Sequence, residues 1–112
     1  MRVELLYFDG CPTYRKLLPR LEAIVEREGV TGGVQLRRVK SVEAAEQERF
    51  LGSPTVRIDG RDIDPSAAAR SDFGLKCRLY PSSEGTLGCP PEQWIVNALR
   101  QPTKWNARGL RG

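Results

Sequence analysis

Cys11 is the residue whose type and position most favour chemistry in this sequence. It follows a short apolar run and directly precedes Pro12, a residue typical of the first turn of a helix. The first N–H groups of a helix have no partner within the helix, and the helix dipole adds partial positive charge there. An exposed cysteine at this place should therefore have a lowered pKa and be a good nucleophile. The alternative is a small buried hydrophobic residue.

The elements that would position Cys11 follow from the spacing of apolar residues. A short run rich in β-branched and aromatic residues, stopped by Asp9-Gly10, indicates a buried strand. After Pro12, apolar residues recur at helical spacing. The elements expected up to residue 63 are a strand over 3–8, a helix ended by Gly29 with Pro19 inside it, a strand over 34–39, a helix over 41–51, and strands over 55–58 and 61–63 joined by Asp59-Gly60.

The remainder of the chain is less regular. We expect a short helix over the alanines 67–69, an extended packed segment over 75–80 and a loop over 81–88. A last helix should follow Pro90-Pro91 and end before Pro102. Its expected buried residues are Trp94, Ile95, Ala98 and Leu99. The prediction is one α/β domain over residues 1–100, with helices on both faces of a mixed central sheet, and a disordered basic tail over 101–112.

Composition and charge narrow the classes of function. Of the 18 basic residues, four lie from position 100 onward, where no acidic residue occurs, so the rest of the chain balances its 14 acidic residues. A neutral body with a short basic tail lacks the clustered patch that nucleic-acid binding requires. The sequence contains neither an apolar stretch long enough for a membrane span nor a signal-peptide pattern, which predicts a cytoplasmic protein with reduced thiols.

Two segments resemble the thioredoxin family. Cys11-Pro12-Thr13-Tyr14, with Pro19 eight residues after the cysteine, resembles the active-site helix of thioredoxins, which has a Cys-x-x-Cys motif and a kinking proline at that offset. Gly52-Ser53-Pro54-Thr55-Val56 resembles the thioredoxin segment whose proline is cis and lies against the active-site cysteine. The resemblance implies a thioredoxin-like fold with βαβαββ order and a C-terminal helix. It also implies a cis Ser53-Pro54 bond, a form found in only about 5–6% of X–Pro bonds.

A narrower resemblance comes from two later segments. Cys77-Arg78-Leu79-Tyr80 and the helix start from Gly88 to Trp94 are similar to segments of small bacterial thioredoxin-like proteins, some of which are loosely labelled alkylmercury lyases. No lyase motif maps onto this chain. The label therefore suggests only that the chemistry involves thiols and soft metals.

The sequence departs from the thioredoxin pattern at Tyr14, which stands where the second motif cysteine would be. Cys11 could then act as a monothiol that waits for an external thiol. Alternatively, Cys77 could be the resolving thiol if its segment folds back over the helix start. The competing interpretation is that Cys77 packs in the core between Leu75 and Leu79. Cys89, in the turn before the last helix, is interpreted as incidental.

Metal and cofactor chemistry finds little support in the residue types. The chain has no histidine and no Cys-x-x-Cys pair, so a zinc site is not expected, and no cofactor motif is present. A two-thiolate site for a soft cation, formed by Cys11 and Cys77, remains geometrically possible.

These observations favour a thiol–disulfide oxidoreductase or thiol-based redox protein that acts through Cys11. Thr13 and Tyr14 would line the site, Pro54 would shape it, and the backbone at Ser53 would pair with a bound peptide or glutathione. The expected partners are a protein disulfide or a low-molecular-weight thiol, and neither nucleic acid nor a membrane. The alternatives are a binder of soft metals or organomercurials through Cys11 and Cys77, and a thioredoxin-fold interaction module without chemistry.

Overall fold

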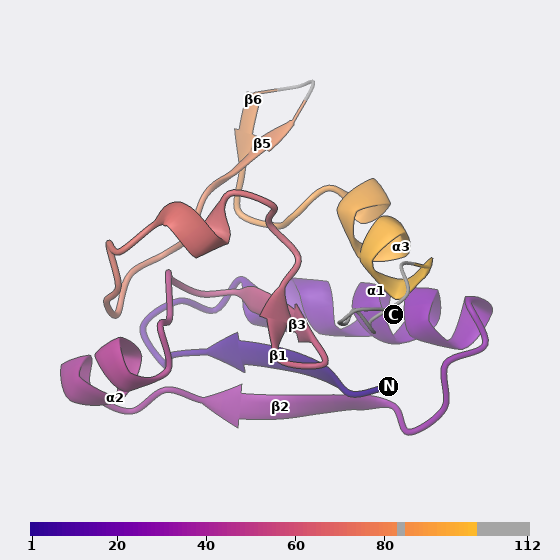
Figure 1. Ribbon diagram of the computed structural model, residues 1–112, viewed down its shortest axis with the longest axis horizontal. Helices are drawn as coiled ribbons and strands as arrows, with labels where there is room; N and C mark the ends of the chain where they lie inside the picture. Colours follow the sequence, from indigo (N-terminus) through magenta and orange to yellow (C-terminus); the bar gives the residue numbers. More distant parts are fainter. Residues whose placement is uncertain (83–84, 101–112) are drawn as a thin grey trace.

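A mixed four-stranded sheet forms the centre of the computed structural model, which describes residues 1–82 and 85–100 (Figure 1). The strand order is β2–β1–β3–β4. Strand β1 pairs in parallel with β2 and antiparallel with β3, which continues through a tight turn into β4. The strands are β1 (Val3–Tyr7), β2 (Val34–Arg38), β3 (Thr55–Ile58) and β4 (Arg61–Asp62). Each matches a predicted strand to within one residue at its ends.

Helices cover both faces of this sheet, which confirms the predicted α/β class. Helices α1 (Tyr14–Arg27) and α3 (Glu92–Arg100) pack on the face that carries Val3, Leu5 and Val56. Helix α2 (Val42–Gln47) contributes Ala45 to a smaller core on the opposite face. The two cores are separate because successive side chains of a strand point to opposite faces, as Leu5 and Leu6 of β1 do.

Helix α1 begins two residues later than Pro12 suggests. Pro12 and Thr13 form a turn, and Thr13 caps the helix without a side-chain hydrogen bond. The predicted end at Gly29 is confirmed. Gly29 adopts a left-handed φ of 77°, its N–H donates to the carbonyl of Glu26, and Val30 N–H donates to the carbonyl of Val25. This is the hydrogen-bond pattern of a Schellman ending, which glycine favours.

Helix α2 is shorter than predicted. It starts as expected, because the Ser41 hydroxyl accepts a hydrogen bond from the Ala44 N–H. It ends at Gln47 rather than near residue 51, because Arg49 takes a left-handed φ of 56°. Phe50 then turns into the core against Leu6 and Val39, and this packing outweighs the helical preference of the sequence.

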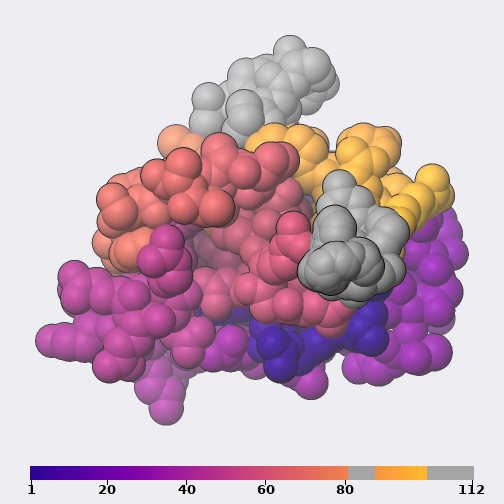
Figure 2. All heavy atoms as spheres, in the orientation of Figure 1, coloured from indigo at the N-terminus to yellow at the C-terminus, as the bar shows by residue number. Residues whose placement is uncertain are grey.

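The chain after β4 lies across the middle of one face of the molecule, between α2 and α3 (Figures 1 and 2). It contains the predicted short helix, η1 (Ala67–Ala69), and an extended stretch that reaches Tyr80. The loop predicted over 81–88 is wrong, because β5 (Tyr80–Ser82) and β6 (Gly85–Leu87) form a separate antiparallel hairpin. The predicted tail over 101–112 lies outside the described residues. Across the described part of the chain, no helix is both long and apolar enough to cross a membrane.

Candidate functional site

Cys11 and Cys77 meet at the end of β1, although 65 positions separate them in the sequence. Each thiol shifts the pKa of the other, and both approach Ser53: Cys11 Sγ donates to the carbonyl of Ser53 at 3.6 Å, and Cys77 forms a β-bridge with the same residue. Cys11 is only 1% exposed, whereas Cys77 lies at the surface. The structure thus brings together the two cysteines that the sequence singled out. The interpretation of Cys77 as a core residue is wrong, since Leu79, its supposed packing neighbour, is also exposed.

Ser53 holds the Cys77 segment in place. The N–H of Ser53 donates to the carbonyl of Lys76 at 2.8 Å, and the N–H of Arg78 donates to the carbonyl of Ser53 at 2.8 Å. Ser53 and Cys77 therefore form a parallel β-bridge immediately before the Ser53-Pro54 peptide, which is cis as predicted. This pairing brings Cys77 to the start of α1, where Cys11 lies.

Gly52 permits this close approach of two backbones. Its φ is 127°, and a Cβ at this position would lie 2.9 Å from Arg78 Cβ and 3.0 Å from the carbonyl oxygen of Lys76. Real Cβ atoms essentially never come within 3.0 Å of another group, so a larger residue would force the two segments apart. The site therefore depends on glycine at position 52.

Hydrogen bonds at the Cys11 sulfur stabilise its thiolate. Burial raises the pKa of Cys11, but hydrogen bonds from Cys77, from the hydroxyl and N–H of Thr13 and from Ser53 outweigh it, so the pKa is lowered overall. Cys11 Sγ lies 3.6 Å from Thr13 Oγ1. The pKa of Cys77 is raised, mainly because its proton is held in the hydrogen bond to Cys11. Of this pair, Cys11 is thus the sulfur that carries the negative charge first.

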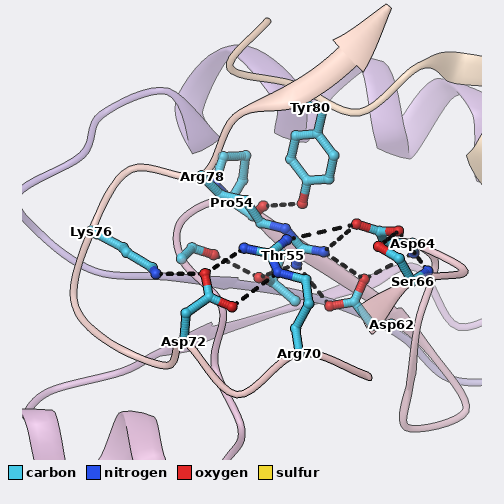
Figure 3. A network of polar contacts seen from close by, with 11 residues as sticks. Pro54, Thr55, Asp62, Asp64, Ser66, Arg70, Asp72, Lys76, Arg78 and Tyr80 are labelled. Atoms are coloured by element: carbon cyan, nitrogen blue, oxygen red, sulfur yellow. Dashed lines mark hydrogen bonds and ion pairs between the residues drawn. The ribbon is translucent and has the colours of Figure 1, made fainter. Parts of the chain in front are cut away.

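Arg78 anchors the segment that carries Cys77 (Figure 3). Its guanidinium is buried and donates to Asp62 at 2.7 and 3.1 Å, to Asp64 at 3.2 Å and to the hydroxyl of Thr55 at 3.0 Å. Burying a charge without partners is strongly unfavourable, so these contacts fix the position of the guanidinium. The sequence did not indicate this cluster, because the carboxylates of Asp62 and Asp64 lie 16 and 14 positions before Arg78 and form no local pattern with it.

Tyr80 adds a second anchor to the cis-proline segment (Figure 3). Its buried hydroxyl donates to the carbonyl of Pro54 at 2.5 Å, and its ring lies 4.7 Å from the guanidinium carbon of Arg78. Along this segment, Cys77 therefore approaches Cys11, Arg78 binds the carboxylates of Asp62 and Asp64, and Tyr80 binds the carbonyl of Pro54. The Cys-Arg-Leu-Tyr segment is thus held against the cis-proline segment by its buried residues Arg78 and Tyr80, while Cys77 and Leu79 are exposed.

Thr13, Tyr14 and Ser53 were also predicted as site residues, and the structure gives each a different role. Thr13 contacts Cys11, as expected for a lining residue. The ring of Tyr14 stacks on Tyr7, with centroids 4.0 Å apart, and its hydroxyl accepts a hydrogen bond from Arg15 at 3.4 Å. The backbone groups of Ser53, expected to bind a peptide or glutathione, are occupied by residues 76–78 of the same chain. External ligands cannot pair with Ser53 while this segment stays in place.

Cys89 lies at the edge of this site. It is partly buried against the core of α1 and α3, and burial raises its pKa. The charges of Arg20 and Lys16 lower this pKa and that of Cys11 raises it, but burial has the largest effect. No group of three or more cysteine, aspartate or glutamate residues suited to a metal ion occurs in the described ranges.

Comparisons with protein-family models, with curated proteins and with solved structures gave no match to this chain. The fold and the cysteine pair are accordingly the observations on which a functional assignment rests.

Proposed function

We propose that the protein is a thioredoxin-like thiol–disulfide oxidoreductase in which Cys11 and Cys77 form the reactive pair. The observation that carries this proposal is the approach of both cysteines to Ser53 beside the cis Ser53-Pro54 peptide, since Cys11 Sγ lies 3.6 Å from the carbonyl oxygen of Ser53 and Cys77 forms a β-bridge with Ser53. A thiolate in contact with a second thiol is the arrangement from which an intramolecular disulfide forms directly.

The topology supports the thioredoxin-like assignment. A parallel β1–β2 pair, an antiparallel β1–β3 pair, a cysteine before α1 and a cis-proline before β3 occur here in the order that the sequence resemblance implies. The difference from that pattern is the source of the second thiol. It comes from residue 77, beside Ser53, and not from the position of Tyr14 in α1.

The reaction proposed is a reversible exchange with a protein disulfide or a low-molecular-weight thiol. In one direction, the two protein thiols lose two protons and two electrons to form the Cys11–Cys77 disulfide, and the partner disulfide is reduced to two thiols. In the other direction, two partner thiols are oxidised to a disulfide while the protein pair is reduced. Thr13 stabilises the Cys11 thiolate in both directions.

Mapping the disulfide after mild oxidation tests this function. The protein is equilibrated with glutathione disulfide, its remaining thiols are blocked in acid, and its peptides are identified by mass spectrometry. We expect a Cys11–Cys77 linkage, retained in Cys89→Ala and absent from Cys77→Ser. A linkage of Cys89 to either residue, or only glutathione adducts, would contradict the proposal.

A soft cation is a second candidate ligand, because the thiols of Cys11 and Cys77 both lie at Ser53. Soft thiolates select soft metals, and two of them suffice for a linear site. Titration with Hg²⁺ should then give one tightly bound ion per chain in Cys89→Ala and none of comparable affinity in either Cys11→Ser or Cys77→Ser. Equal affinity in these single variants would exclude the two-sulfur site.

A further inference from the structure

The two sulfurs of the pair differ in their access to solvent. Cys11 is 1% exposed, and its sulfur is surrounded by Thr13, Ser53 and Cys77. Cys77 is exposed. This inference rests on the proposed function and concerns the order in which the two sulfurs react. We propose that Cys77 is the sulfur that meets the substrate and that Cys11 is the buried sulfur that leaves and resolves, the reverse of the order that a cysteine at a helix start suggests.

The backbone contacts of Ser53 support this assignment. An incoming peptide that paired with Ser53 would present its own sulfur to Cys11. That position is already taken, since the N–H and carbonyl of Ser53 bond to Lys76 and Arg78, each at 2.8 Å. Cys77 thus occupies the place of a substrate cysteine within the same chain. A substrate from solution reaches Cys77 without displacing this segment, whereas it reaches Cys11 only after the segment has moved.

The stabilisation of Cys11 suits it to be the leaving group. In thiol–disulfide exchange, a thiolate attacks one sulfur of a disulfide, and the sulfur with the lower pKa leaves faster. The Cys11 thiolate accepts hydrogen bonds from Thr13, whose hydroxyl oxygen lies 3.6 Å away. The Ser53 hydroxyl is buried and has no other hydrogen-bond partner among the residues described, so it can also donate to that thiolate. Both the exposure and the leaving-group chemistry therefore direct attack to Cys77.

The oxidised protein then acts as an oxidant of thiols. A substrate thiolate attacks Cys77 Sγ, a bond forms between these two sulfurs, the Cys11–Cys77 bond breaks, and Cys11 departs as a thiolate. A second substrate thiolate attacks the substrate sulfur of the mixed disulfide, which releases a substrate disulfide and the Cys77 thiolate. That thiolate takes up a proton, which restores the reduced protein. By microscopic reversibility, a disulfide that oxidises the reduced protein passes through the same mixed disulfide on Cys77.

Trapping the mixed disulfide tests which sulfur reacts first. The reduced protein in the Cys89→Ala background is mixed with the chromogenic disulfide dithiobis-nitrobenzoate, and nitrothiobenzoate release is followed by stopped flow. Samples quenched in acid are mapped by mass spectrometry. Cys11→Ser and Cys77→Ser are compared in the same background, because serine nearly preserves the size of cysteine and retains a hydrogen-bond donor. Repeating the mapping with hydroxyethyl disulfide excludes an effect of reagent size.

If Cys77 reacts first, the Cys89→Ala protein carries its early adduct on Cys77 and releases two equivalents of nitrothiobenzoate as Cys11 resolves it. The Cys11→Ser variant then reacts rapidly and keeps a stable adduct after one equivalent, while Cys77→Ser reacts roughly tenfold or more slowly because Cys11 is buried. An early adduct on Cys11, with fast reaction of Cys77→Ser, would overturn the assignment while leaving the oxidoreductase function intact. Failure of that function has a different result: one stable adduct in the Cys89→Ala protein and no Cys11–Cys77 disulfide.

Discussion

Replacing Gly52 by alanine should break the contact that brings Cys77 to Cys11. Two effects add at this position. A φ of 127° is unfavourable for an L-residue, by about 1–3 kcal/mol. The new Cβ would also lie 2.9 Å from Arg78 Cβ, so that the segment has to move. If one or both hydrogen bonds to Ser53 are lost, each contributes about 1 kcal/mol more. We expect Gly52→Ala to lower the free energy of unfolding by roughly 2–5 kcal/mol.

Gly29→Ala is the matched control. Gly29 also has a positive φ, 77°, but no atom lies within 4 Å of the position that its Cβ would take. Its replacement should therefore show only the backbone effect, about 1 kcal/mol. The difference between the two variants isolates the close approach of residue 52 to residues 76–78. Unfolding of both variants in urea, followed by circular dichroism, measures the two free energies.

The same pair of variants tests the site as well as the fold. Losing one Ser53 hydrogen bond, about 1 kcal/mol, should weaken the Cys11–Cys77 disulfide about fivefold in equilibrium with glutathione, since 1.4 kcal/mol corresponds to a factor of ten. Gly29→Ala should leave that equilibrium unchanged. If both variants lose the same stability and keep the same disulfide equilibrium, residues 76–78 do not approach Gly52 as described, and the reasoning fails.

Four further predictions follow from individual contacts. Thr13→Val removes a hydroxyl beside Cys11, so a titration of thiolate absorbance should show a higher pKa for Cys11, with little change in stability because this hydroxyl does not cap α1. Arg78→Met leaves the carboxylates of Asp62 and Asp64 without their buried cation, and urea unfolding should show a loss of about 3–5 kcal/mol. Burial raises the pKa of Asp64, but hydrogen bonds from Ser66 and Arg78 outweigh it and lower this pKa below its ordinary 3.8. The carboxylate therefore stabilises the folded protein fully well above pH 3.8 and loses this effect as the pH falls below it, and Asp64→Asn should flatten this part of the curve of unfolding free energy against pH. Ser41→Ala should lower the unfolding free energy by about 1 kcal/mol in the same assay, through loss of the cap at the start of α2.

The elements of the sheet could be predicted because each depends on neighbours in sequence. The short apolar run of β1, the helical spacing of α1 and the Asp59-Gly60 turn all act within a few residues, and each element forms within two residues of its expected bounds. The predictions failed where tertiary packing determined the local structure. Helix α2 stops early because Phe50 is drawn into the core, and the β5–β6 hairpin forms from residues with no clear alternation.

The sequence suggested that Cys11 and Cys77 could pair, but it could not establish that they lie together. Leu75 and Leu79 lie two positions to either side of Cys77, and residues two apart in a strand share a face. This spacing favoured the interpretation of Cys77 as a core residue. What reversed this expectation was Arg78, whose side chain is buried against Asp62 and Asp64. Three residues at 62, 64 and 78 become a cluster only after β4 has placed the carboxylates beside the later segment, and no local pattern indicates that arrangement.

The buried arginine also explains why Cys77 and not a neighbouring residue faces Cys11. Successive side chains of an extended segment point in opposite directions, so a shift by one residue would exchange the places of Cys77 and Arg78. Such a shift would remove the guanidinium from Asp62 and Asp64 and place it at the sulfur of Cys11. The loss of the buried cation from Asp62 and Asp64 makes such a shift unfavourable. The register that satisfies Arg78 is therefore the register that joins the two thiols.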